Sequence, residues 1–210
     1  MKKLLCVLLA LTMLLAFCGC ENKAALAVEE QINALGQITL ESGDAITAAE
    51  VAFNSLDPKD RLEVRNSAAL AAAMVTYENL QEKEQADIID QLIRDLRPIT
   101  VNSAKALTNA ENLYNSADIE VKLKVKNFPE MVDAFQLYRF LCIDQVEVKI
   151  TAIGEVTLES GDKIRIAQNA YDALSEEDKP WVYNSYDLQQ AQETFKALQE
   201  QGETEAAEAK

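Results

Sequence analysis

Side chains that could do catalytic chemistry are few in this chain. Histidine is absent from the sequence, which excludes histidine-based catalytic triads, histidine proton shuttles and histidine-ligated metal sites. Carboxylates cluster at residues 41–44, at their twin 159–162 and at 176–178. Calcium loops alternate oxygen ligands and glycosidase carboxylates need a cleft, so we interpret the first two clusters as helix caps and the third as a solvated face. We therefore predict no catalytic residue, no metal and no cofactor.

Two aromatic residues, Trp181 and Tyr183, are the candidates for binding a partner. They flank Val182, a residue of core type, in the third of three repeats described below. Exposed aromatic rings anchor interfaces and stack on sugars. The alternative is that both rings pack against the end of the last helix or the tail. The aligned positions in the other two repeats are charged: Glu63, Arg65, Lys124 and Lys126.

The first nineteen residues predict an export signal. Lys2 and Lys3 precede an apolar run over residues 4–17 that only Thr12 interrupts. Fourteen residues are too few to cross a bilayer as a helix, which takes about 20. The length is typical of the hydrophobic region of a secretory signal peptide. We assign residues 1–19 to this signal and residues 20–27 to an anchor and linker.

The end of this run resembles the lipobox of bacterial lipoproteins at Gly19 and Cys20, whereas Phe17 and Cys18 depart from that motif. The resemblance implies that Cys20 carries acyl chains such as palmitate and holds the protein on the outer face of the cytoplasmic membrane. Ordinary cleavage and secretion is the alternative. The other cysteine of the mature chain, Cys142, lies on an apolar stripe. We expect a buried thiol there, while an exposed thiol would suggest a covalent dimer.

The acidic charge of the chain restricts its partners. Twenty basic and 35 acidic residues give a net charge of −15, which becomes −17 when Lys2 and Lys3 leave with the signal. Nucleic acids and anionic lipid surfaces both attract basic patches, so we expect no nucleic-acid partner. Contact with the membrane would rest on the lipid anchor alone.

Three copies of one unit fill the chain after residue 27. Residues 28–80 align without gaps on residues 146–198, and 23 of these 53 positions are identical. A more divergent copy, residues 89–141, aligns with the first at a shift of 61 and lacks its Gly36. Internal repetition of this length is typical of helical arrays. The remaining residues, 199–210, are acidic and contain Gly202, so we predict a disordered tail in which this glycine breaks the helix.

Apolar residues recur at helical spacing in each copy, and this spacing predicts three helices per unit. In the first copy Gly36 is suited to end the first helix, a short extended crossing follows, and Ser42 is suited to cap the second helix. Residues 67–97 and residues 130–153 contain no glycine and no proline. The last helix of one copy should therefore continue into the first helix of the next. We predict an all-α fold of three tandem three-helix units, elongated and spectrin-like, sharing long connecting helices.

The repeat pattern in residues 146–160, 164–174 and 182–188 resembles the tandem helical repeats of secreted and cell-surface proteins of Gram-positive bacteria. Such repeats accompany glycosidases, adhesins and other modular surface proteins. The resemblance implies a non-catalytic role. We expect a non-enzymatic spacer or scaffold at the cell envelope, with a peptide- or glycan-binding module at Trp181 and Tyr183 as the alternative.

Overall fold

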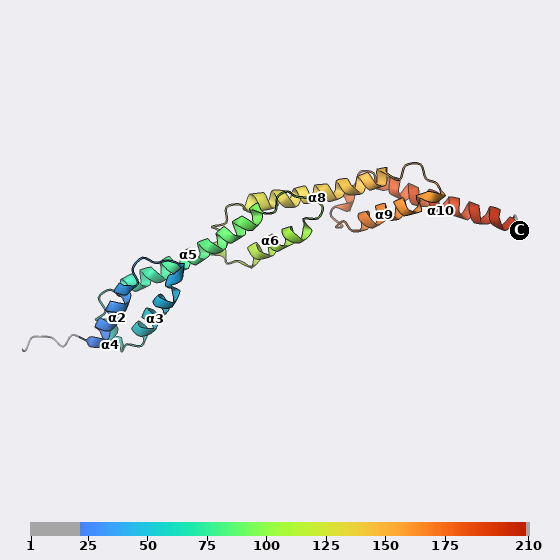
Figure 1. Ribbon diagram of the computed structural model, residues 1–210. Helices are drawn as coiled ribbons and strands as arrows, with labels where there is room; N and C mark the ends of the chain where they lie inside the picture. Colours follow the sequence, from blue (N-terminus) through green and yellow to red (C-terminus); the bar gives the residue numbers. More distant parts are fainter. Residues whose placement is uncertain (1–21, 209–210) are drawn as a thin grey trace, which may run out of the picture. The chain divides into compact units, whose positions relative to one another are not determined.

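The computed structural model describes residues 22–208, and all regular structure in this range is helical (Figure 1). It comprises nine α-helices and three short 3₁₀ helices, without any strand among the described residues. The all-α prediction is confirmed. The predicted signal peptide and Cys20 lie outside the described residues. Within the described part, no helix combines the length and the apolar character needed to cross a bilayer.

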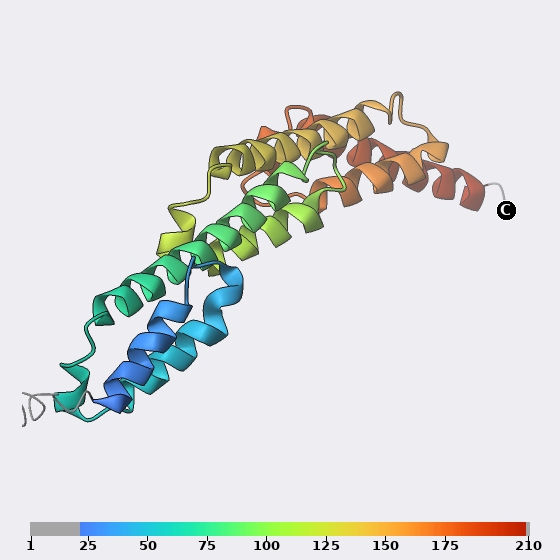
Figure 2. The ribbon, with the colours of Figure 1, turned by 60° about the vertical axis from the view of Figure 1, so that its left-hand side comes forward.

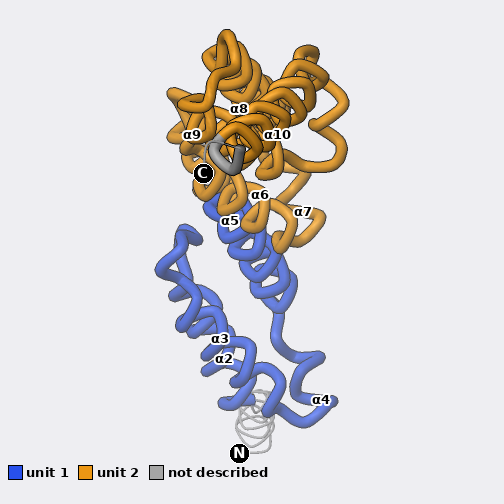
Figure 3. Tube along the Cα trace, turned by 90° about the vertical axis from the view of Figure 1, so that its right-hand side faces the viewer, with its two compact units in different colours: residues 1–85 blue, residues 86–210 orange. Residues whose placement is uncertain are grey.

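The chain divides into two compact units, residues 1–85 and residues 86–210 (Figure 3). Unit 1 contains α2 (Lys23–Ala34), the 3₁₀ helix η2 (Leu40–Ser42), α3 (Gly43–Asn54) and α4 (Pro58–Arg61). The helix α5 (Ser67–Arg94) gives its first part to unit 1 and its last turns to unit 2. The uninterrupted helix predicted after residue 67 is thus present. The core of unit 1 consists of buried Ala25, Val28, Ile32, Ala49, Val64 and Leu70.

The first helix begins earlier than the sequence analysis placed it. The side-chain oxygen of Asn22 accepts hydrogen bonds from the backbone N–H groups of Ala24 and Ala25 at 3.1 and 3.3 Å, which is how asparagine caps a helix. Ala25 is buried in the core. Assigning all of residues 20–27 to a linker was therefore wrong, because residues 23–27 form the first turn and more of α2.

Unit 2 holds two cores that share one helix. Its remaining elements are α6 (Ala104–Ser116), α7 (Ile119–Lys122), α8 (Phe128–Thr151), η3 (Leu158–Ser160), α9 (Gly161–Asp172), η4 (Lys179–Trp181) and α10 (Ser185–Glu208). The first part of α8 packs with α5 and α6 through Met131 and Ala134, and its last part packs with α9 and α10 through Val146 and Ile150 (Figures 1 and 2). One continuous helix therefore serves both cores.

A pair of polar side chains, which we call the clasp, recurs in all three copies. Each copy has an asparagine at the same aligned position, just before its long helix begins. A carboxylate on the first helix accepts a hydrogen bond from the backbone N–H of the residue before this asparagine. The asparagine in turn donates a hydrogen bond from Nδ2 to the backbone carbonyl of the carboxylate residue. In the first copy Glu29 and Asn66 make these bonds at 2.7 and 2.9 Å. The others are Asp90 with Asn127 and Glu147 with Asn184. The clasp fixes the start of each long helix against the first helix of its copy.

The crossing between the first and second helices differs in detail from the prediction. Gly36 has φ of 59°, which confirms its left-handed conformation at the end of α2. Thr39 is extended but forms no strand, and its N–H donates to Ser42 Oγ at 3.0 Å. The same bond recurs from Thr100 and Thr157 at their aligned serines. Ser42 thus occupies the N-cap position of α3, but its side chain accepts the N–H of Thr39 and makes no capping hydrogen bond to α3. Its predicted role as a side-chain cap of α3 is therefore wrong.

The last helix also corrects a prediction. We expected Gly202 to break the helix and residues 199–210 to form a disordered tail, whereas α10 continues to Glu208. Alanine and glutamate dominate this segment and both favour helix. Their combined propensity outweighs the cost of one glycine, which is about 1 kcal/mol.

We predict that removing the clasp carboxylate of the second copy destabilises unit 2. Asp90 is only 3% exposed and accepts the N–H groups of both Lys126 and Asn127. Its replacement in Asp90→Ala leaves these part-buried donors without their acceptor, which should lower the unfolding free energy by about 1–3 kcal/mol. Urea unfolding followed by circular dichroism measures this. The control is Asp133→Ala, an exposed carboxylate of α8, for which a change beyond about 0.5 kcal/mol is not expected. Equal effects from the two variants would contradict the role of the clasp.

Candidate binding groove

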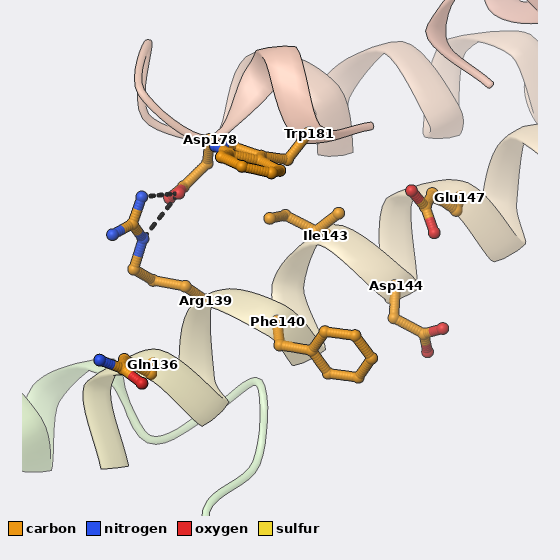
Figure 4. A pocket seen from close by; sticks show the side chains of 8 residues that line it. All are labelled: Gln136, Arg139, Phe140, Ile143, Asp144, Glu147, Asp178 and Trp181. Carbon is orange, nitrogen blue, oxygen red and sulfur yellow. Dashed lines mark hydrogen bonds and ion pairs between the residues drawn. The ribbon is translucent and has the colours of Figure 1, made fainter. Parts of the chain in front are cut away.

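An open groove of about 600 Å³ lies in unit 2 beside α8, at the point where this helix passes from the first core to the second. Six of its lining residues come from α8 and two from the turn that contains η4 (Figure 4). They are Gln136, Arg139, Phe140, Ile143, Asp144, Glu147, Asp178 and Trp181. The groove is therefore built by one helix and one turn, within a single unit.

The turn before η4 is held to α8 by Asp178. Ser175 Oγ donates to Asp178 Oδ2 at 2.8 Å, and the N–H of Asp178 donates to Ser175 Oγ at 3.2 Å. Arg139 Nε and Nη2 both approach Asp178 Oδ1, at 2.7 and 2.5 Å. These contacts place Trp181 over the groove, where Figure 4 shows its indole facing Ile143. Trp181 nevertheless remains 72% exposed, so most of its ring is open to a ligand.

The electrostatics of the turn follow from this ion pair. Burial raises the pKa of Asp178, but hydrogen bonds from Arg139 and Ser175 lower it by more, so the pKa of Asp178 lies below its ordinary value. The same pair raises the pKa of Arg139. Asp178 is therefore ionised at neutral pH, and its charge is matched by the guanidinium beside it.

The clasp of the third copy also contributes to the groove. Glu147 lines it and uses Oε1 to accept the N–H of Tyr183 at 3.0 Å, while Asn184 Nδ2 donates to the carbonyl of Glu147 at 3.0 Å. The backbone of Tyr183 is thus fixed, but its side chain is 78% exposed and does not line the groove. The structure places Trp181 in the groove and Tyr183 outside it. With these exposures, neither ring is packed away against the last helix or the tail.

The first copy contains an equivalent groove with different chemistry. It has a volume of about 330 Å³ and is lined by Asn22, Ala25, Leu26, Glu29, Leu62, Glu63 and Arg65. At a shift of 118, Asn22, Ala25 and Glu63 align with the three apolar residues of the groove in unit 2, Phe140, Ile143 and Trp181. The fold thus provides a depression in both copies, and the side chains make only the third-copy groove aromatic.

Sequence reasoning found Trp181 but missed the other walls of the groove. Phe140 and Arg139 precede residue 146, where the third copy was taken to begin. Extending the alignment of the copies toward the N-terminus would have set Phe140 against Asn22 and shown one more aromatic substitution. The contact of Arg139 with Asp178 joins residues 39 positions apart, and no spacing pattern predicts it.

The remaining candidate side chains have local roles. Glu41 and Glu159 each accept a hydrogen bond from the threonine two residues earlier, at 2.6 and 2.8 Å, and this bond lowers the pKa of Glu41. Cys142 is partly buried, and its hydrogen bond with Tyr138 raises the pKa of the tyrosine. Residues 22–208 contain no group of three or more side chains arranged to hold a metal ion.

We predict that the ion pair of Asp178 makes stability depend on pH in the acid range. Because the folded-state pKa of Asp178 is lowered, its contribution is fully present above the pKa of an unfolded aspartate, about 4. It is lost as the pH falls through the folded-state value. Arg139 is half-exposed, so we expect Asp178→Asn to cost about 1 kcal/mol at neutral pH.

Urea unfolding of the wild type and the variant from pH 7 down to pH 2 tests this expectation. The difference in unfolding free energy should shrink toward the acid end. Asp162→Asn, which removes an exposed ion pair with Arg165, serves as the control and should change the unfolding free energy little at neutral pH. A difference for Asp178→Asn that stays constant down to pH 2 would contradict the assignment.

Comparison of the chain with protein-family models, with curated proteins and with solved structures finds no match.

Proposed function

We propose that this chain is a non-enzymatic helical repeat protein that acts as a spacer or scaffold on the outer surface of a bacterial cell. The observation that carries the proposal is α8, a single helix of 24 residues that contributes to two separate cores. Because the same helix belongs to both cores, no flexible linker separates them, and the helix sets the distance between them. The proposed task of the protein is to hold groups at a defined separation.

Size and repetition support this proposal. Units of about 55 residues bury a small fraction of their surface and are marginal alone, whereas neighbours that share helices stabilise one another. The three clasps, one per copy, support a three-unit, spectrin-like array as its finer form. The resemblance to the surface repeats of Gram-positive bacteria and the lack of histidine support a non-catalytic role.

A second candidate function is a binding module for peptide or glycan. The specific observation in its favour is the groove around Trp181, because the fold repeats the depression in the first copy without the aromatic side chains. Aromatic side chains of the kind that anchor interfaces line the third-copy groove, whereas the first-copy groove has no aromatic side chain among its lining residues. A scaffold that also carries one binding groove is compatible with both candidates.

We predict that a proline in the middle of α8 makes the distance between the two cores of unit 2 variable. Leu141 lies between Tyr138, which packs on the first core, and Ile143, which packs on the second. Leu141→Pro should cost about 3 kcal/mol locally while leaving both cores folded. Spin labels on Asn109→Cys in α6 and Ala197→Cys in α10, with the four native cysteines replaced by serine, report the distance.

The expected result is a narrow distance distribution that broadens in Leu141→Pro, with most of the helical circular dichroism retained. Glu203→Pro near the end of α10 is the control and should leave the distribution narrow. An unchanged distribution in Leu141→Pro would show that α8 does not set the separation. Complete unfolding would show that the two cores are one cooperative unit, against the proposed modular array.

We predict that Cys20 carries the proposed membrane anchor. Cys20→Ala should release the protein into the medium or leave the precursor uncut, because the acyl chains would have no thiol to attach to. Mass spectrometry of the mature N-terminus in the wild type decides the matter. An unmodified terminus at Gly19 or Cys20 would support ordinary secretion, the alternative to anchoring.

A further inference from the structure

We infer that the groove beside α8 binds a cationic peptide segment, in which a lysine or arginine side chain lies along the groove next to an apolar residue. This inference rests on the second candidate function, binding by the third copy, and names the class of ligand.

The side chains of α8 form two parallel rows in the groove. One row is Gln136, Phe140 and Asp144, and the other is Arg139, Ile143 and Glu147, each at intervals of four residues. Residues at this spacing are neighbours on a helix surface, about 5–6 Å apart. Both rows therefore present an apolar side chain followed, one turn later, by a carboxylate (Figure 4).

This order matches the side chain of lysine or arginine. Such a side chain has an apolar stem and a charged head, so the stem can lie over Phe140 and Ile143 while the head reaches Asp144 or Glu147. The indole of Trp181, which faces Ile143 across the groove, adds a ring face to which a cation is attracted. Phe140 and Trp181 are 64% and 72% exposed, so both are accessible for this contact.

The charges of the groove favour a cation. Arg139 is the only basic residue among the eight described lining residues, and Asp178 already neutralises it. Asp144 makes no hydrogen bond or ion pair with any described residue, and Glu147 uses one carboxylate oxygen for Tyr183. The groove thus keeps an uncompensated negative charge at one end.

Other occupants fit this arrangement less well. A second copy of the chain carries a net charge of −15 and would be repelled by the carboxylates. A neutral glycan could stack on Trp181 and donate hydroxyl hydrogen bonds to the carboxylates, but it carries no positive charge to compensate theirs. The peptide is therefore the occupant that uses every wall of the groove.

Trp181 is the only tryptophan of the chain, so its fluorescence reports on the groove directly in the full-length protein. The probes are an acetylated and amidated peptide of alternating lysine and leucine, its counterpart with glutamate in place of lysine, and an oligomer of N-acetylglucosamine. The lysine peptide should change the emission in a saturable manner that weakens with added salt. The glutamate peptide and the oligosaccharide should leave the emission unchanged.

Two groove variants and one control test the contacts. Asp144→Asn should weaken binding of the lysine peptide about threefold, through loss of an exposed charge pair. Phe140→Asn, which introduces the residue found at the aligned position Asn22, should weaken it about fivefold through loss of apolar contact. Glu155→Gln removes an equal charge from an exposed position outside the groove and should leave the affinity unchanged.

The outcomes separate the inference from the function on which it rests. A response to the oligosaccharide without one to the lysine peptide would overturn the cationic-peptide inference and leave a glycan-binding module. Equal weakening by Asp144→Asn and Glu155→Gln would show that only the net charge attracts the peptide, and would also overturn the inference. If none of the three probes changes the Trp181 emission, both the inference and the second candidate function are overturned, while the spacer proposal stands.

Discussion

The constraint on which each copy depends is the clasp between the first helix and the start of the long helix. A carboxylate accepts a backbone N–H at that start, where intrahelical acceptors are lacking, and an asparagine returns a hydrogen bond to the carbonyl of the carboxylate residue. Buried polar groups cost free energy unless they are paired, so this exchange fixes one register between the two helices. Val64 and Val182, which precede the clasp asparagines by two residues, are buried in the corresponding cores.

Sharing of helices follows from the position of the clasp. In unit 2 the long helix of one copy continues as the first helix of the next, so α8 starts at the clasp asparagine of the second copy and carries the clasp carboxylate of the third. Glu147 therefore has two roles, since it holds the start of α10 and lines the groove beside Trp181. The scaffold and the candidate binding site use the same helix, which is why we regard spacing and binding as compatible functions.

Glycine shows how small differences between copies follow from packing. An added Cβ at Gly161 would lie 2.8 Å from the Phe195 ring, and one at Gly43 would meet Tyr77 in the same way. Such contacts are too close for a side chain, so glycine lets the aromatic ring of the long helix approach the start of the second helix. The second copy has Ala104 at the aligned position, and Arg97 and Pro98 stand where the first copy has Gly36 and Gln37.

The sequence by itself determined the helical class, the repeat register and most of the core, because apolar spacing along a helix is a local property. It also indicated Gly36 as a left-handed turn and the absence of breaks in α5 and α8. The clasp was partly visible, since Asn66 recurs at Asn127 and Asn184, but its carboxylate partners lie some 36 positions away. Only the tertiary structure decided which carboxylate meets which N–H, that Ser42 bonds to Thr39, and that Arg139, Phe140 and Trp181 meet in one groove. These contacts depend on how helices distant in sequence are set against each other, and periodicity within one helix does not encode that arrangement.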